Sequence, residues 1–142
     1  TTLIAGFPGE NDKQFESLCE FVKKARFDRL GCFAYSAEEG TAAAEFDGQL
    51  DEDTKARRAE IIYEEQSRIM FEKNEKQIGK TIEVVCEGFD RYAECFFGRS
   101  YMDAPEIDGK IFFTAEKKPS QGEFIKVRIT DTLDFDLLGE RV

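Results

Sequence analysis

The spacing of hydrophobic and polar positions predicts a strand, a helix and a second strand in the first part of the chain. An apolar run over residues 2–7 closes at Pro8-Gly9, which is typical of a buried strand and its turn. Asn11 and Gln14 have the spacing of a helix capping box. The apolar positions that follow recur with helical spacing, at Phe15, Leu18, Cys19 and Val22. Residues 29–36 predict the second strand, and a strand–helix–strand order favours parallel pairing.

A long helix is predicted after a loop at residues 37–50 that is rich in small residues and carboxylates. It begins at Asp51, where negative charge is favourable, and Gly79 marks its end. Its predicted buried stripe consists of Ala59, Ile62, Tyr63, Gln66, Ile69 and Met70. Arg57 and Arg58, one turn into this helix, are expected to pair with carboxylates, although exposed pairs contribute little stability.

The apolar spacing changes to period two after Gly79, which predicts strands instead of helices. Five strands are expected, at residues 80–88, 91–97, 110–115, 123–130 and 135–142. So many short strands favour a closed barrel, because closure leaves no exposed sheet edge. The chain is therefore predicted to be a multidomain α+β protein. A partial parallel α/β region at residues 1–78 precedes a five-stranded antiparallel, OB-like β-barrel at residues 79–142.

The composition narrows the chemistry that the chain can perform. It contains no histidine, which excludes histidine-based acid–base catalysis and serine–histidine triads. Its four cysteines have no metal-site spacing and are interpreted as free thiols of a cytoplasmic protein. No apolar run is long enough to span a bilayer. The net charge of −10 disfavours general binding of nucleic-acid phosphates and favours a basic protein partner.

Three segments together resemble the C-terminal part of the radical-SAM methylthiotransferase family, and within it the RimO type. They are TTLIAGFPGE at residues 1–10, YSAEEGTAAA at residues 35–44 and GRSYMDAPEIDG at residues 98–109. The resemblance covers essentially the whole chain. It implies that residues 1–78 are the end of a radical-SAM, TIM-like barrel with a long linking helix, and that residues 79–142 are a TRAM domain.

The resemblance also implies an activity. Enzymes of the RimO type add a methylthio group to the β-carbon of an aspartate in a small-subunit ribosomal protein, using S-adenosylmethionine and two [4Fe–4S] clusters. The C-x-x-x-C-x-x-C loop that binds the radical-SAM cluster does not occur here. We therefore expect no catalytic residue, no metal ligand and no bound cofactor in this chain, and no activity from the chain alone.

Two groups of residues are candidate site residues by this resemblance. Ile4, Gly6 and Tyr35 are expected to form part of the wall of the S-adenosylmethionine pocket, because catalytic sites lie at the C-terminal ends of barrel strands. Three carboxylates are expected to contact the basic ribosomal protein: Asp103, Glu106 and Asp108. Residues 81–142 hold 13 acidic and 8 basic side chains, a net charge of −5, which suits such a partner.

Two alternative functions stay open at this point. The chain could come from a tRNA adenosine methylthiotransferase whose TRAM domain binds RNA, or it could be a stand-alone binding module. The two predicted parallel strands also lack barrel neighbours in this sequence, so we expect self-association through the strand at residues 2–7 or the face beside it, while the barrel from Lys80 onward stays folded. The apolar side chains expected to face the barrel interior are Leu3, Ile4, Phe7, Leu30, Phe33 and Tyr35.

Overall fold

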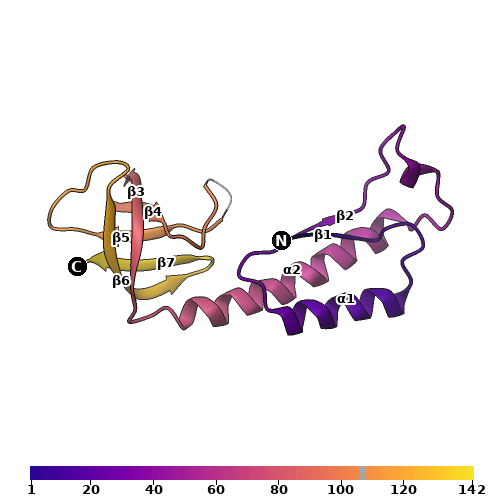
Figure 1. Cartoon of the computed structure of the whole chain (residues 1–142), viewed down its shortest axis with the longest axis horizontal. Coiled ribbons are helices and arrows are strands. Elements are labelled where there is room, and N and C mark those ends of the chain that lie inside the picture. The colour runs from indigo at the N-terminus through magenta and orange to yellow at the C-terminus, as the bar shows by residue number, and fades with distance from the viewer. Residues whose placement is uncertain (106–107) are drawn as a thin grey trace. The chain divides into compact units, whose positions relative to one another are not determined.

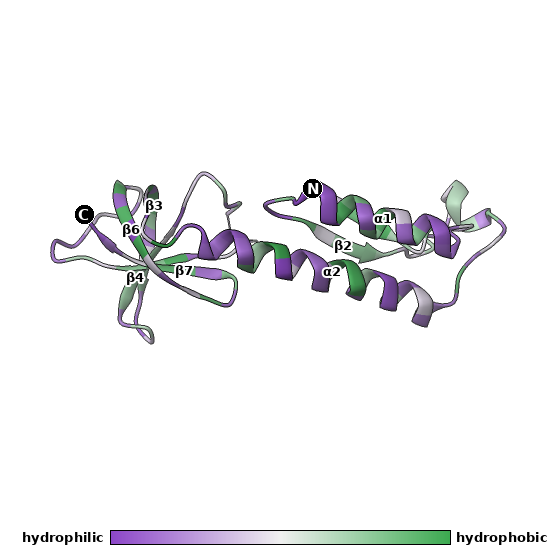
Figure 2. Cartoon of the chain, turned by 90° about the horizontal axis from the view of Figure 1, so that it is seen from below, coloured by the Kyte–Doolittle hydropathy of each residue, from purple (hydrophilic) through white to green (hydrophobic). Residues whose placement is uncertain are grey.

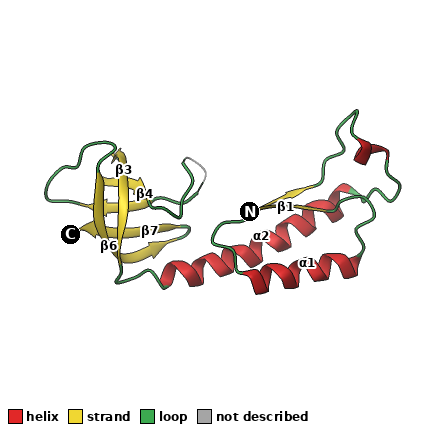
Figure 3. Cartoon of the chain, in the orientation of Figure 1, coloured by secondary structure: helices red, strands yellow, loops and turns green. Residues whose placement is uncertain are grey.

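The computed structural model describes residues 1–105 and 108–142, which fall into two compact units (Figures 1 and 3). Unit 1 comprises Thr1–Ile69 and unit 2 comprises Met70–Val142, so the boundary lies within the second helix. Among the described residues, no helix combines the length and the hydrophobicity needed to cross a bilayer. The domain boundary predicted near residue 79 stays a prediction.

Unit 1 is built on a two-stranded parallel sheet, as predicted. Strand β1 (Thr2–Ala5) pairs in register with β2 (Gly31–Ala34), and helix α1 (Asp12–Ala25) connects them. The Asn11–Gln14 capping box is present, with the Gln14 amide donating to Asn11 Oδ1 at 3.0 Å and the Asn11 amide donating to Gln14 Oε1 at 2.9 Å. These hydrogen bonds satisfy backbone donors at the helix start, which explains why α1 begins at Asp12.

The second helix covers the same side of the sheet as α1. After a short 3₁₀ turn, η1 (Ala42–Glu45), helix α2 runs over Glu52–Glu75. A small core joins the two helices to the strands and centres on Val22, Ile62 and Ile69. In Figure 2 both helices show hydrophobic and hydrophilic positions alternating along their length, as expected for half-buried helices.

Two details of the predicted packing in unit 1 were wrong. Leu3 and Leu30 were predicted to face the interior of a larger barrel, but they pack into the core that the two helices form. Tyr63 was predicted to lie in the buried stripe of α2, but it is exposed. The stripe is displaced because the helix buries Lys55, Arg58, Ile62, Gln66 and Ile69, which include polar positions that apolar periodicity does not reveal.

Unit 2 is a closed barrel of five strands within the described residues. The strands are β3 (Thr81–Asp90), β4 (Cys95–Arg99), β5 (Ile111–Thr114), β6 (Phe124–Leu133) and β7 (Asp136–Arg141). Around the barrel their order is β3-β4-β5-β7-β6. The predicted barrel is confirmed, but its antiparallel character was wrong. Strand β7 lies between β5 and β6 and runs parallel to β5, so the barrel is mixed.

The barrel core is formed by side chains that alternate between the inside and the outside along the strands. Val84, Phe113, Val127 and Ile129 are fully enclosed at its centre. The predicted end of the first strand was wrong, because β3 continues through a bulge at Cys86/Gly88 to Asp90. Residues 91–94, predicted as strand, form the turn instead. Bulges bend a strand and increase its twist, which suits the end of a small barrel.

The end of α2 is attached to unit 2 by local contacts. The rings of Phe71 and Phe135 stack with centroids 5.5 Å apart. The Asn74 side-chain amide donates to the Phe135 carbonyl at 3.3 Å, and the Gly79 amide donates to the Ile129 carbonyl at 2.8 Å. These contacts explain why the residues from Met70 onward form one compact unit with the barrel.

Candidate functional site

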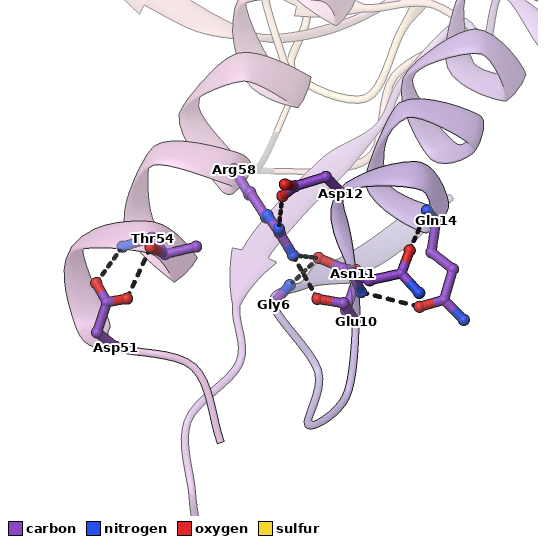
Figure 4. Close-up of polar contacts among 8 residues, drawn as sticks. All are labelled: Gly6, Glu10, Asn11, Asp12, Gln14, Asp51, Thr54 and Arg58. Atoms are coloured by element: carbon purple, nitrogen blue, oxygen red, sulfur yellow. Dashed lines mark hydrogen bonds and ion pairs between the residues drawn. The ribbon is translucent and has the colours of Figure 1, made fainter. Parts of the chain in front are cut away.

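A buried ionic network lies at the carboxyl end of β1, where the chain turns into α1 (Figure 4). The Glu10 carboxylate accepts hydrogen bonds from the Gly6 amide at 2.9 Å and from Arg58 at 2.8 Å. Arg58 also donates to the Glu10 carbonyl at 2.9 Å and to the Asp12 carboxylate at 2.7 Å. The Arg58 and Glu10 side chains are only 9% and 13% exposed, so this ion pair is screened far less than a surface pair. Arg58 thereby fixes the whole turn between β1 and α1.

Gly6 is required by the backbone and by its neighbour Lys55. Its φ of 76° lies in the left-handed region that glycine adopts without strain. A Cβ placed at Gly6 would also lie 2.5 Å from Cγ of Lys55, closer than carbon atoms approach. Gly6 was predicted to leave room for a nucleoside. The structure adds that it leaves room for the buried lysine stem.

Lys55 and Tyr35 lie together just beyond the carboxyl end of β2. The Lys55 ammonium is 5.6 Å from the centroid of the Tyr35 ring and 2.5 Å from the Glu52 carboxylate. The Tyr35 ring makes an edge contact with Phe7, with centroids 5.2 Å apart. The Tyr35 hydroxyl is buried and has no hydrogen-bond partner among residues 1–105 and 108–142. A buried hydroxyl without a partner destabilises the fold, so a contribution to stability does not explain why a tyrosine stands at this position.

The sheet face opposite the helices carries an exposed apolar pair. Ile4 and Phe33 are register partners in β1 and β2, and their side chains are 55% and 65% exposed. This face and the Tyr35 hydroxyl supply an apolar surface and an unsatisfied hydrogen-bonding group close to the ends of the same two strands.

The cysteines of the chain do not fit an iron–sulfur cluster. Cys19 lies in α1, Cys32 in β2, Cys86 in β3 and Cys95 in β4. Burial raises the pKa of each thiol, whereas a cluster binds thiolates. Across residues 1–105 and 108–142, no group of three or more Cys, Asp or Glu side chains is placed to hold a metal ion.

The carboxylates predicted to contact a partner lie in the connection between β4 and β5. Asp103 is buried, and its carboxylate accepts from the Ser100 amide at 3.1 Å and the Ser100 hydroxyl at 2.8 Å. The Asp108 carboxylate accepts from the Ala104 amide at 2.7 Å. Both side chains therefore stabilise the connection itself. Glu106 lies outside the described residues.

The sequence did not reveal that Lys55 belongs to this region, and it did not separate Arg58 from Arg57. Arg58 is buried and paired, whereas Arg57 is exposed. The available signal was the helical spacing of Lys55, Arg58 and Ile62, which places all three on one face. The Asp51 carboxylate caps α2, as its position suggested, and the Thr54 amide and hydroxyl lower the pKa of that carboxyl.

Comparison with known families identifies the barrel. Residues 78–142 match the family described as the TRAM domain. Over 140 residues the chain is 49% identical to a protein of Caldicellulosiruptor saccharolyticus and 44% identical to one of Thermoanaerobacter sp. strain X514. Over 139 residues it is 45% identical to a protein of Clostridium botulinum strain Hall. All three are named ribosomal protein uS12 methylthiotransferase RimO.

These matches cover almost all of the chain but a minor part of each relative. They include 98–99% of the chain and 31–32% of the length of the relatives. The chain therefore spans less than a third of the relatives that it matches.

Proposed function

Because the chain matches the C-terminal end of the RimO-type ribosomal protein uS12 methylthiotransferases and carries a TRAM domain, we propose that it is the substrate-recognition part of such an enzyme. The enzyme's reaction is the addition of a methylthio group to the β-carbon of an aspartate of uS12. The observation that carries the proposal is the match at 44–49% identity along almost the whole chain. The residues of the chain suit a binding role, with partner recognition in unit 2 and a pocket wall in unit 1.

In unit 1, Ile4, Gly6 and Tyr35 form part of the wall of the S-adenosylmethionine pocket. When bound, S-adenosylmethionine supplies radical chemistry to the enzyme. Ile4, together with Phe33, offers an exposed apolar face for the adenosyl group. Gly6 keeps the turn after β1 in its conformation, and Arg58 holds that turn through Glu10. The Tyr35 hydroxyl is enclosed by the protein, and it hydrogen-bonds the ligand once the bound ligand displaces the side chains that cover it. The cysteines of this chain take no part in cluster binding.

The Tyr35 hydroxyl gives a direct test of the pocket. Tyr35→Phe is expected to stabilise unit 1 by about 1 kcal/mol, because it removes a buried polar group that has no partner. In the complete enzyme the same substitution is expected to weaken S-adenosylmethionine binding by about tenfold, the effect of one lost hydrogen bond. Isothermal titration calorimetry and thermal unfolding measure the two effects.

The control for this test is Tyr92→Phe, whose side chain is fully exposed in the turn between β3 and β4. It is expected to change neither the affinity nor the stability. If Tyr35→Phe destabilises unit 1 and leaves the affinity unchanged, then the hydroxyl has a structural role and Tyr35 does not belong to the pocket wall.

In unit 2, the barrel and its β4–β5 connection recognise the basic ribosomal protein. The net charge of −5 over residues 81–142 favours encounter with a positively charged protein and opposes binding to phosphates. Asp103 holds the connection in shape through Ser100, and the sequence of this segment adds two further carboxylates, Glu106 and Asp108. The apolar pair of Ile4 and Phe33 also supports self-association of the chain when no other segment covers it.

Titration of the chain against purified uS12 and against tRNA tests the proposed function. We expect uS12 to bind at least about tenfold more tightly than tRNA at moderate salt, because the barrel has the wrong sign of charge for phosphate contacts. Fluorescence anisotropy at two salt concentrations measures both affinities. Tighter binding of tRNA would favour the tRNA methylthiotransferase alternative, and binding to neither would remove substrate recognition from this part of the enzyme.

A further inference from the structure

An apolar row crosses three strands on the outside of the barrel. Gly98, Ile111 and Leu137 are buried, so strand alternation places the residues on either side of each of them outside. Three of these outside residues are Phe97 in β4, Phe112 in β5 and Leu138 in β7, here called the outer row. Phe97 pairs with Phe112, and Phe112 pairs with Leu138, so the three side chains lie side by side. All three are partly exposed.

One ring of the outer row already binds a cation of the same chain. The Lys110 ammonium lies 4.8 Å from the centroid of the Phe97 ring, within the range of a cation–π interaction. The rings of Phe97 and Phe112 are 6.5 Å apart and tilted by 52°, so they present neighbouring faces. Gly88 lies beside Phe97, and a Cβ there would be 3.1 Å from the ring, which shows how closely the ring approaches β3.

Charged side chains of both signs border the outer row, and most of the positive ones are engaged by a group of the same chain, as Lys110 is by the Phe97 ring. Arg99 lies two residues after Phe97 on the same face of β4, and it pairs with Glu87 at 2.8 Å. Arg128 forms a second pair, with Glu140. Asp131 is exposed and is the register partner of Leu138 at the far end of the row. With the net charge of −5 over residues 81–142, the barrel as a whole attracts cations, and Asp131 places one exposed carboxylate at the end of the row.

We propose that the outer row is the docking surface for a basic protein segment, whose Arg or Lys head groups lie over the rings of Phe97 and Phe112. The aliphatic stems of these side chains cover Leu138, and Asp131 faces the remaining positive charge. This inference rests on the proposed function and gives the partner surface its residues. Aromatic rings also stack with nucleic-acid bases, but such sites combine the rings with a positively charged groove, whereas residues 81–142 carry a net charge of −5.

The first test replaces the two rings and keeps their apolar volume. In the 142-residue chain, the double variant Phe97→Leu/Phe112→Leu is expected to bind purified uS12 about tenfold more weakly, because leucine has no ring to attract a cation. The matched control is Phe124→Leu, which changes an outward ring of β6 that is 68% exposed and outside the row. It is expected to leave the affinity unchanged. Circular dichroism verifies that all variants keep the barrel.

The second test moves the affinity in the opposite direction. Lys110→Met removes the ammonium that competes for the Phe97 ring and is expected to tighten uS12 binding about threefold, within the range of one exposed cation–π interaction. Lys118→Met removes the same charge from an exposed position of the β5–β6 connection. Lys110→Met must tighten binding more than Lys118→Met does, because otherwise the effect is one of net charge.

The outcomes separate this inference from the proposed function. If the unaltered chain does not bind uS12, both are overturned. If it binds uS12 and the ring variants bind equally well, the outer row is not the docking surface and the proposed function stands. If the ring variants lose affinity for tRNA and keep their affinity for uS12, the row is a nucleic-acid surface and this inference is overturned.

Discussion

Replacing Arg58 by methionine is expected to destabilise unit 1 by about 3–5 kcal/mol, the cost of removing one partner from a buried ion pair. The substitution leaves the Glu10 carboxylate largely enclosed without a counter-ion and frees the turn between β1 and α1. Amide hydrogen exchange in α1 measures the effect separately from the barrel. A loss of this size is a large part of the stability of a small domain, so the α1 amides are expected to lose most of their protection.

The neighbouring arginine and a double variant serve as controls. Arg57→Met changes an exposed side chain on the same helix and is expected to alter stability by less than about 0.5 kcal/mol. In the double variant Arg58→Met/Glu10→Gln, the neutral amide oxygen still accepts from the Gly6 amide and no charge is left buried. This double variant should be more stable than Arg58→Met alone. Equal losses of stability in Arg57→Met and Arg58→Met would show that the Glu10–Arg58 ion pair does not contribute to the stability of unit 1.

Replacing Gly98 by alanine is expected to destabilise the barrel by more than about 3 kcal/mol, beyond the usual cost of overpacking. Gly98 pairs with Cys86 across β3 and β4. A Cβ at this position would overlap the carbonyl oxygen of Val85 and lie 2.8 Å from Cγ1 of Val84. The obstruction is backbone of the adjacent strand, so no side-chain rotation relieves it. Far-ultraviolet circular dichroism and amide exchange of the barrel strands measure the loss.

Gly31 provides the matched control for Gly98. It is also a strand glycine, but a Cβ there would meet no heavy atom within 4 Å. Gly31→Ala is therefore expected to be neutral or to stabilise unit 1 by about 0.4–1 kcal/mol, because alanine restricts the unfolded chain. If the barrel amides of Gly98→Ala keep their full protection, the prediction is wrong. The strands β3 and β4 would then move apart to accommodate the added methyl group without loss of stability.

Local signals in the sequence were sufficient for the elements. The capping box of Asn11 and Gln14 depends on two side chains and the backbone beside them, so its geometry was readable without the rest of the fold. A strand was predicted at residues 123–130, and Ile125, Val127 and Ile129 of β6 lie in the core because side chains of a strand alternate by geometry alone. The parallel pairing of β1 and β2 followed from the strand–helix–strand order.

The pairing of strands in the barrel could not be predicted from the sequence, because it depends on how the sheet closes. The insertion of β7 between β5 and β6 makes one pair of strands parallel. The residues of a single strand do not indicate which other strand it pairs with. The bulge at Cys86/Gly88 likewise extends β3 to Asp90 against a turn signal in the sequence. In the candidate site, too, some features were expected from the sequence and others depend on the tertiary structure. Gly6 and Tyr35 were proposed as site residues from the family resemblance, whereas the burial of the Tyr35 hydroxyl depends on the neighbouring elements that enclose it.

The sequence by itself determined where helices and strands form, which of their faces are apolar and that the barrel is acidic. These properties depend on short-range backbone geometry and on a sum of charges. The tertiary structure alone decided that Arg58 and not Arg57 becomes buried, that Lys55 lies over the Tyr35 ring, and that Phe97, Phe112 and Leu138 align across three strands. Each of these depends on residues far apart in the chain coming into contact. The free energy of such a contact depends on burial, which no local pattern contains.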